Sequence, residues 1–75
     1  MKKITMYTGP RCGYCEAAKR LLIRNNAPYN EIDISKVAGA VDEMINKANG
    51  KRTIPQIFFD DQHIGGYDEV RALEK

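Results

Sequence analysis

Residues 3–15 read KITMYTGPRCGYC, and this stretch decides the fold that the rest of the chain must complete. Residues 3–7 alternate between apolar and polar side chains, as a half-buried strand does. Residues 8–11 are turn material, and a helix is predicted from residue 13 to about residue 25. A strand, a tight loop and a helix in this order predict the first half of a parallel unit with a crossover helix.

The remaining chain predicts three more strands and two more helices. Periodicity indicates strands over residues 29–34, 56–59 and 63–64, a helix over about 37–49, and a last helix after the glycines at 65 and 66. The side chains expected to face inward from these two helices are Val37, Val41, Met44, Ile45, Ala48, Val70 and Leu73. The order β-α-β-α-β-β-α predicts an α/β fold with a four-stranded mixed sheet and three helices on its two faces.

Length and composition describe a single domain, residues 1–75, with 29% charged residues and a formal net charge of +2. Basic and acidic residues are interleaved, which argues against nucleic acid as a partner. No stretch approaches the roughly 20 apolar residues of a membrane span. No apolar run of a signal peptide follows the first lysines. We therefore expect a cytoplasmic protein that binds neither nucleic acid nor membrane.

Cys12-Gly13-Tyr14-Cys15 lies where the predicted loop enters the predicted helix. Unsatisfied backbone N–H groups and the positive end of the helix dipole favour an anion there. The pKa of Cys12 should therefore fall below the value of about 8.5 of a free thiol, and Arg11 adds positive charge next to it. Cys15 should be more buried and within disulfide distance, so that Cys12 can attack and Cys15 can resolve a mixed disulfide.

A zinc site and a structural staple are the alternatives to redox chemistry for the cysteine pair. A structural zinc site needs four ligands, whereas the chain offers two thiols and a single histidine, His63. A disulfide across so short a loop would stabilise the fold only weakly, so packing or stapling is a poor reason for the pair. A C-x-x-C motif between a strand and a helix in a βαβ chain is typical of redox chemistry.

Two further segments each have a structural and a functional interpretation. Pro55 immediately precedes a predicted strand. It either starts that strand as a trans proline or forms a cis bond that places the backbone of Ile54 beside the thiols. Residues 65–68, Gly-Gly-Tyr-Asp, are either a turn before an acidic helix start or a carboxylate site of free backbone N–H groups, where Asp68 receives an ammonium group. His63 fits a packing or surface residue better than a catalytic base.

Four pieces of the chain together resemble the glutaredoxin family, and they cover almost its full length in the family's order. They are Met6-Tyr7-Thr8, Cys12-Gly13-Tyr14-Cys15, Thr53-Ile54-Pro55-Gln56-Ile57-Phe58 and His63-Ile64-Gly65-Gly66-Tyr67-Asp68. The resemblance implies a thioredoxin fold, a cis Pro55 and a glutathione-dependent thiol–disulfide oxidoreductase. It implies glutathione, glutathione reductase and NADPH as the source of electrons. The implied substrates are disulfide-containing or glutathionylated proteins, with ribonucleotide reductase among the candidates.

The same resemblance assigns a set of residues to glutathione. In chain order they are Arg11, Tyr14, Lys51, Arg52, Thr53, Ile54, Pro55, Gly66, Tyr67 and Asp68. Tyr14 would flank the bound tripeptide, residues 53–55 would pair with its cysteinyl backbone, and residues 66–68 would hold its γ-glutamyl end. One of the three basic residues would meet the glycyl carboxylate, because the lysine that family members often carry near Gly9 is missing here.

The resemblance leaves two rival functions. Gly13 stands where the family usually has proline, which is similar to glutaredoxins that can hold an iron–sulfur cluster. Cys12 from each of two chains and two glutathione thiolates would complete the four ligands of a [2Fe–2S] cluster, whereas the apo enzyme would be a metal-free monomer. The other rival is an electron donor to ribonucleotide reductase that thioredoxin reductase serves, although such proteins tend to lack the Gly-Gly-Tyr-Asp segment.

Overall fold

The computed structural model describes residues 3–73, which form seven elements. In chain order they are β1 (Ile4–Thr8), α1 (Gly13–Arg24), β2 (Tyr29–Asp33), α2 (Ala40–Lys47), β3 (Gln56–Phe59), β4 (Gln62–Gly65) and α3 (Tyr67–Ala72). The predicted order of elements is confirmed.

The four strands form one mixed sheet in the order β2-β1-β3-β4. β1 runs parallel to β2 and antiparallel to β3, and β3 and β4 form an antiparallel hairpin. Tyr7, the second-last residue of β1, pairs with Gln56, the first residue of β3. The chain that leaves β1 and the chain that enters β3 therefore meet at one end of the sheet.

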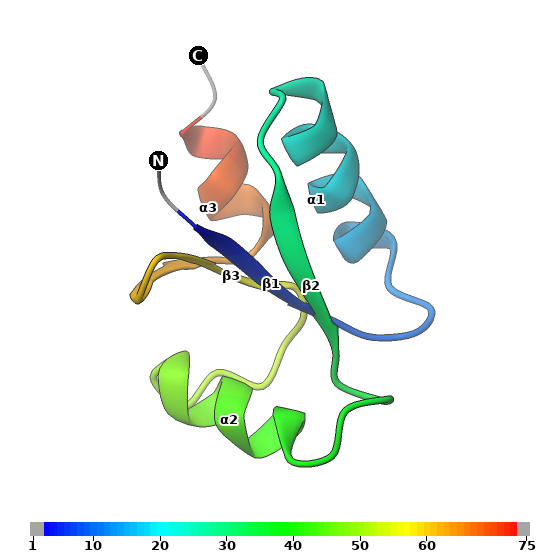
Figure 1. Ribbon diagram of the computed structural model, residues 1–75, viewed down its shortest axis with the longest axis vertical. Helices are drawn as coiled ribbons and strands as arrows, with labels where there is room; N and C mark the ends of the chain where they lie inside the picture. Colours follow the sequence, from blue (N-terminus) through cyan, green and yellow to red (C-terminus); the bar gives the residue numbers. More distant parts are fainter. Residues whose placement is uncertain (1–2, 74–75) are drawn as a thin grey trace.

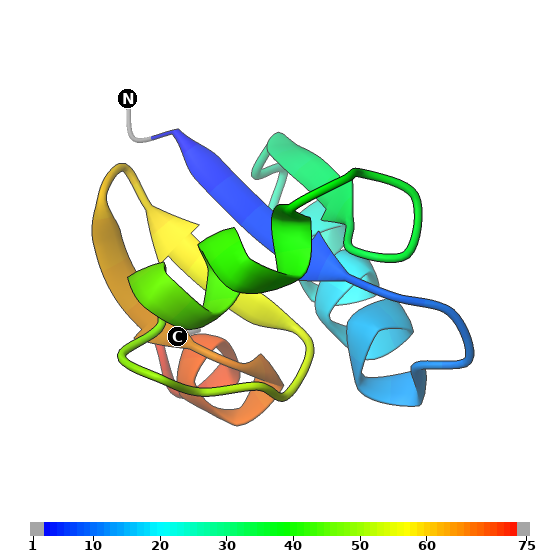
Figure 2. The ribbon, with the colours of Figure 1, turned by 90° about the horizontal axis from the view of Figure 1, so that it is seen from below.

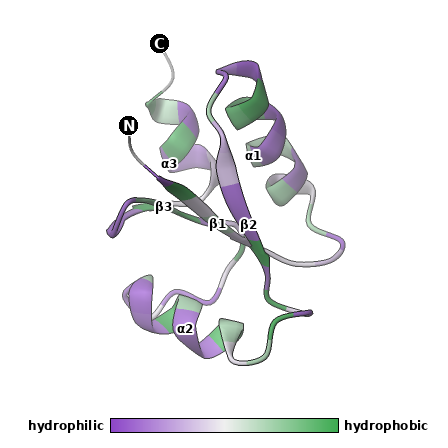
Figure 3. Cartoon of the chain, viewed as in Figure 1, coloured by the Kyte–Doolittle hydropathy of each residue, from purple (hydrophilic) through white to green (hydrophobic). Residues whose placement is uncertain are grey.

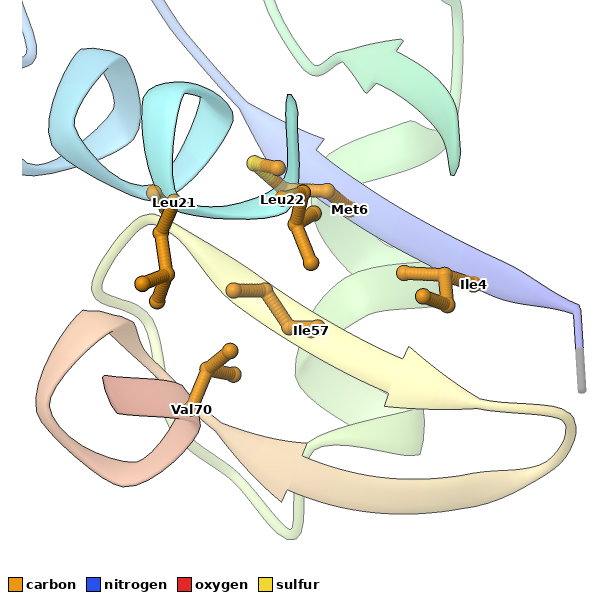
Figure 4. Close-up of a cluster of buried hydrophobic side chains, with 7 residues drawn as sticks. Ile4, Met6, Leu21, Leu22, Ile57 and Val70 are labelled. Atoms are coloured by element: carbon orange, nitrogen blue, oxygen red, sulfur yellow. The ribbon is translucent and has the colours of Figure 1, made fainter. Parts of the chain in front are cut away.

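Helices cover both faces of the sheet, as predicted (Figures 1 and 2). On one face, side chains of β1 and β3 pack against those of α1 and α3 (Figure 4). This cluster contains Ile4, Met6, Ala18, Leu21, Leu22, Ile57 and Val70. The cluster on the face that α2 covers contains Tyr7, Met44, Ala48 and Phe58. Successive residues of β1 point to opposite faces, so a single strand contributes to both clusters.

The start of α2 differs from the prediction, which placed Val37 and Val41 on the buried side. Val37 donates its N–H to the carbonyl of Asp33 at 3.1 Å, which makes a turn. Gly39 then adopts a left-handed φ of +77°, which an α-helix cannot continue through. The helix begins at Ala40. Its buried side consists of Ala40, Met44 and Ala48, whereas both valines are exposed. Figure 3 shows hydrophilic and hydrophobic residues alternating around α2.

The last helix, α3, buries one of the two side chains that were predicted to face inward. Val70 is buried in the cluster beside α1, as predicted. Leu73 is 55% exposed, contrary to the prediction, because α3 ends at Ala72 and Leu73 caps it beyond the packed turn. Within residues 3–73, no helix has the length and apolar character needed to cross a membrane.

An ion pair fastens α1 to the edge strand β2. Nζ of Lys19 lies 2.8 Å from the carboxylate of Glu31, and that carboxylate also accepts a hydrogen bond from the hydroxyl of Thr8 at 2.7 Å. The contact with Lys19, followed by that with Thr8, holds the pKa of Glu31 below its usual range. Glu31 in turn raises the pKa of Lys19. The helix that carries both cysteines is thereby tied to β1 and β2.

Low pH should weaken the ion pair between Lys19 and Glu31. Because the pKa of Glu31 is lowered on folding from 4.5, its stabilising contribution is fully present above that value and is lost as the pH falls through the folded-state pKa. Glu31→Gln should therefore reduce the decline of the unfolding free energy on acidification below about pH 5. Urea denaturation at several pH values measures this, with Asp42→Asn on the exposed side of α2 as the control. Equal pH slopes for Glu31→Gln and the unmutated chain would contradict the prediction.

The corrected orientation of α2 gives a second stability prediction. Met44 is fully buried whereas Val41 is 43% exposed. Met44→Ala should lower the unfolding free energy by about 2–5 kcal/mol, because it leaves a cavity beneath α2. Val41→Ala should change the unfolding free energy by less than about 0.5 kcal/mol. Urea unfolding of both variants measures the difference, and similar losses would mean that Val41 is buried after all.

Candidate active site

The two cysteines lie at the N-terminus of α1. Cys12 occupies the N-cap position and Cys15 lies in the first turn. Their Cα atoms are 5.2 Å apart, and their sulfurs form a disulfide. Cys15 is 2% exposed, whereas Cys12 is only half-buried. The pair therefore has one sulfur that a substrate can reach and one that lies behind it, as the spacing predicted.

The start of α1 directs a hydrogen-bond donor at the accessible sulfur. The backbone N–H of Cys15 donates to Sγ of Cys12 at 3.1 Å. The carbonyl of Cys12 accepts from the N–H of Glu16 at 3.2 Å, so the residue is held by the first helical turn. When the disulfide is reduced, the same N–H and the positive end of the helix dipole face a thiolate. This arrangement favours the ionised form of Cys12.

The segment before β3 lies against the cysteines. The peptide bond between Ile54 and Pro55 is cis, which confirms that part of the prediction. The carbonyl oxygen of Ile54 lies 3.8 Å from Sγ of Cys12. The carbonyl of Ile54 therefore lies beside any group that becomes attached to the sulfur of Cys12.

A groove of about 320 Å³ runs beside this segment. Eight of the ten residues predicted to contact glutathione line it: Tyr14, Lys51, Thr53, Ile54, Pro55, Gly66, Tyr67 and Asp68. Gln56 and Glu69, which we did not predict, also line it. Arg11 lines a separate groove of about 460 Å³ that includes both cysteines. Arg52 is not among the residues that line either groove.

Two tyrosines from different helices stand together at the groove. The ring of Tyr14 on α1 and the ring of Tyr67 on α3 have centroids 6.1 Å apart and planes inclined by 35°. Tyr14 is 65% exposed, an unusual environment for a large aromatic side chain. The two rings give the groove apolar surface in addition to its charged groups.

The start of α3 has fewer free donors than the sequence suggested. One of the two interpretations of residues 65–68 was a carboxylate site made of free backbone N–H groups. The N–H of Gly66 instead donates to Oε1 of Glu69 at 2.7 Å, which closes a cap within the chain. A glutamate three residues after a helix N-cap is a known signal for this interaction, so it could have been read from the sequence. The carboxylate of Asp68 remains available as a charged group of the groove.

A partly buried hydrogen-bond network behind the cis-proline segment was also missed. The side-chain amide of Gln56 donates to the carbonyl of Thr53 at 2.8 Å and to its hydroxyl at 3.1 Å. Nε2 of His63 lies 2.7 Å from Oε1 of Gln56. The ring of His63 also packs on Phe58, with centroids 5.0 Å apart. Burial, followed by the charge of Lys51, lowers the pKa of His63. The contacts of its ring with Gln56 and Phe58 fit a packing role.

The rest of the described surface has fewer groups that could take part in a reaction. A cavity of about 450 Å³ lies between β1, β3 and the end of α2 and includes neither cysteine. Within residues 3–73, no cluster of three or more His, Cys, Asp or Glu side chains is placed to hold a metal ion. The cysteines and the cis-proline segment therefore remain the strongest candidate for an active site.

Comparison with known proteins supports the same conclusion. The sequence model of the glutaredoxin family matches residues 4–64. The chain belongs to the glutaredoxin family. A probable glutaredoxin from Synechocystis sp. is 46% identical over 72 residues, which cover 96% of this chain and 82% of that relative. Membership of this family identifies the chain as an oxidoreductase.

Solved glutaredoxin structures share its fold. The solution structure of a glutaredoxin from Brucella melitensis is 44% identical, with a TM-score of 0.81 over 99% of this chain and 79% of that one. The crystal structure of a buckwheat glutaredoxin–glutathione complex is 29% identical, with a TM-score of 0.81 over 95% of this chain and 66% of that one. These similarities confirm the thioredoxin fold.

The geometry of this glutaredoxin predicts an acidic thiol at Cys12. In a Cys15→Ser variant, where Cys12 is the single thiol, the pKa should lie clearly below the value of about 8.5 of free cysteine. The rate of alkylation by iodoacetamide as a function of pH measures it. Unfolding the same variant in urea should return the pKa to the free value. A midpoint near 8.5 in the folded variant would contradict the helix-terminus argument.

Proposed function

We propose that this chain is a glutathione-dependent thiol–disulfide oxidoreductase, which reduces glutathione mixed disulfides and protein disulfides through the Cys12/Cys15 couple. The observation that carries the proposal is the position of Cys12. Its sulfur receives an N–H at 3.1 Å from the start of α1 and lies 3.8 Å from the carbonyl of Ile54. An activated sulfur beside an open backbone segment suits attack on a disulfide that is presented by a peptide.

In the first step the thiolate of Cys12 attacks the glutathione sulfur of a mixed disulfide. A bond forms between Cys12 and glutathione, and the substrate leaves as a thiolate that takes up a proton from solvent. A second glutathione can then attack the bound glutathione sulfur, which releases oxidised glutathione and regenerates Cys12. With a protein disulfide, Cys12 forms a mixed disulfide with the protein, and Cys15 displaces that protein as the Cys12–Cys15 disulfide closes.

The groove beside the cis-proline segment supports glutathione as the tripeptide partner. In this proposal residues 53–55 pair with its cysteinyl backbone, and Tyr14 flanks it. Residues 66–68 hold its γ-glutamyl end, with Asp68 meeting the ammonium group. Lys51 is the favoured partner for the glycyl carboxylate, because it lines the same groove. The buckwheat relative, solved as a complex with glutathione, supports glutathione as the ligand by analogy.

The other predictions have no further support from the described residues. A [2Fe–2S] cluster would take one ligand, Cys12, from each of two chains, because Cys15 is buried. Ribonucleotide reductase as a substrate, a monomeric apo state and a cytoplasmic location likewise stay predictions. The dithiol function is the one that a specific contact at Cys12 favours.

The two cysteines should differ in a coupled assay with glutathione, glutathione reductase and NADPH. Cys12→Ser should abolish turnover of a glutathionylated peptide, because it removes the attacking thiolate. Cys15→Ser should retain that turnover, since a second glutathione can complete the cycle, but should lose most reduction of a protein disulfide by the dithiol route.

Both variants must be shown to fold, since each replaces a sulfur at the same helix terminus. Near-ultraviolet circular dichroism and thermal unfolding provide this control. Equal loss of activity from the two substitutions on the glutathionylated peptide would overturn the assigned roles. Turnover that does not depend on added glutathione would overturn the proposed reductant.

A further inference from the structure

The segment that faces Cys12 is held by a side chain from β3. Gln56 is 2% exposed, although it is polar and precedes three apolar residues of the same strand. A buried primary amide requires partners for both its N–H bonds and its oxygen. The carbonyl and the hydroxyl of Thr53 take the two donors, at 2.8 and 3.1 Å.

These contacts determine which way the amide points. A carbonyl oxygen can only accept, so the NH₂ of Gln56 must face Thr53 and its Oε1 must face away. Nε2 of His63 lies 2.7 Å from that Oε1. Because an amide oxygen cannot donate, Nε2 must carry a proton, and His63 is the donor.

The chain of contacts leads from the edge of the sheet to the active site. His63 on β4 donates to Gln56 on β3, and Gln56 donates to Thr53. The next residue, Ile54, has its carbonyl 3.8 Å from Sγ of Cys12. Neither Gln56 nor His63 contacts that sulfur, so their effect on it passes through the segment.

We propose that Gln56 and His63 are positioning residues, which hold the backbone of Thr53 and Ile54 in the place where a glutathionylated substrate docks. This inference rests on the proposed function, because it assumes that this backbone meets the substrate. Substrate positioning controls binding and alignment of the reacting sulfurs. Loss of the network therefore weakens docking and leaves the intrinsic reactivity of Cys12 unchanged.

The test uses reduced protein in the Cys15→Ser background and two forms of one peptide, glutathionylated and cysteinylated. His63→Gln keeps an N–H donor that can reach Oε1 of Gln56, and His63→Leu removes it. Gln56→Met keeps the length of the side chain without its amide. Gln62→Met, at an exposed position of the same hairpin, is the matched control.

Gln56→Met should raise KM for the glutathionylated peptide about fivefold, with kcat changed less than about twofold, as expected for loss of a typical hydrogen bond. His63→Leu should act in the same direction, whereas His63→Gln and Gln62→Met should behave as the parent does. The cysteinylated peptide, which lacks most of the groove contacts, should show a smaller change. Alkylation of Cys12 by iodoacetamide should keep its rate and pH profile in every variant.

Several results would overturn the inference. Suppose that the parent prefers the glutathionylated peptide, but that His63→Leu and Gln56→Met have the same KM as the parent. This result would refute the positioning role and leave the proposed function intact. Altered alkylation of Cys12 in both variants would show a general structural effect. His63 lies on an edge strand and is half-buried, so its two variants keep the test valid if Gln56→Met fails to fold. A parent that does not distinguish the two peptides would overturn the proposed function itself, and the inference with it.

Discussion

The active site depends on the hydrogen bond from the N–H of Cys15 to the sulfur of Cys12, and the rest of the structure holds these two residues in place. This hydrogen bond exists only if the sulfur lies at the N-terminus of a helix, and it is useful only if that sulfur stays accessible. The packing of α1 meets both conditions. Leu21 and Leu22 bury the far half of the helix against the sheet, while Cys12 at its start stays only half-buried.

The opposite wall of the site comes from a distant part of the chain. Because Tyr7 pairs with Gln56, the residues before β3 come next to the loop after β1. The fit is close: a Cβ at Gly9 would lie 2.7 Å from Cδ1 of Ile54. A side chain at position 9 would therefore displace the end of the Ile54 side chain, so the two segments pack closely. Sheet register, not local sequence, thus sets the distance between sulfur and backbone.

Local sequence signals explain why much of this could be predicted. The element order, the position of the cysteines and the core side chains of β1 and α1 follow from periodicity and helix-start chemistry. The start of α2 could not be predicted in this way, because the apolar period continues through Val37 and Val41 while Gly39 and the turn after β2 interrupt the helix. Gln56 was missed for a different reason. Thr53 lies three residues before it, across the cis-proline turn, and His63 lies seven residues after it, across the β3–β4 hairpin. Apolar periodicity, on which the prediction relied, does not reveal such contacts.

The charges of the groove argue for the kind of ligand it can hold. Lys51 contributes a cation, and Asp68 and Glu69 contribute carboxylates. One oxygen of Glu69 is already used by the N–H of Gly66, so Asp68 is the carboxylate with more capacity for a ligand. A simple anion would gain from Lys51 but would be repelled by Asp68, whereas a zwitterionic peptide can satisfy both signs. With two tyrosine rings as apolar surface, the groove is therefore better suited to a short peptide that carries charges of both signs than to a phosphate or a plain carboxylate. The proposed partner, glutathione, is a peptide of this kind, and the charges of the groove support it without reference to the cysteine motif.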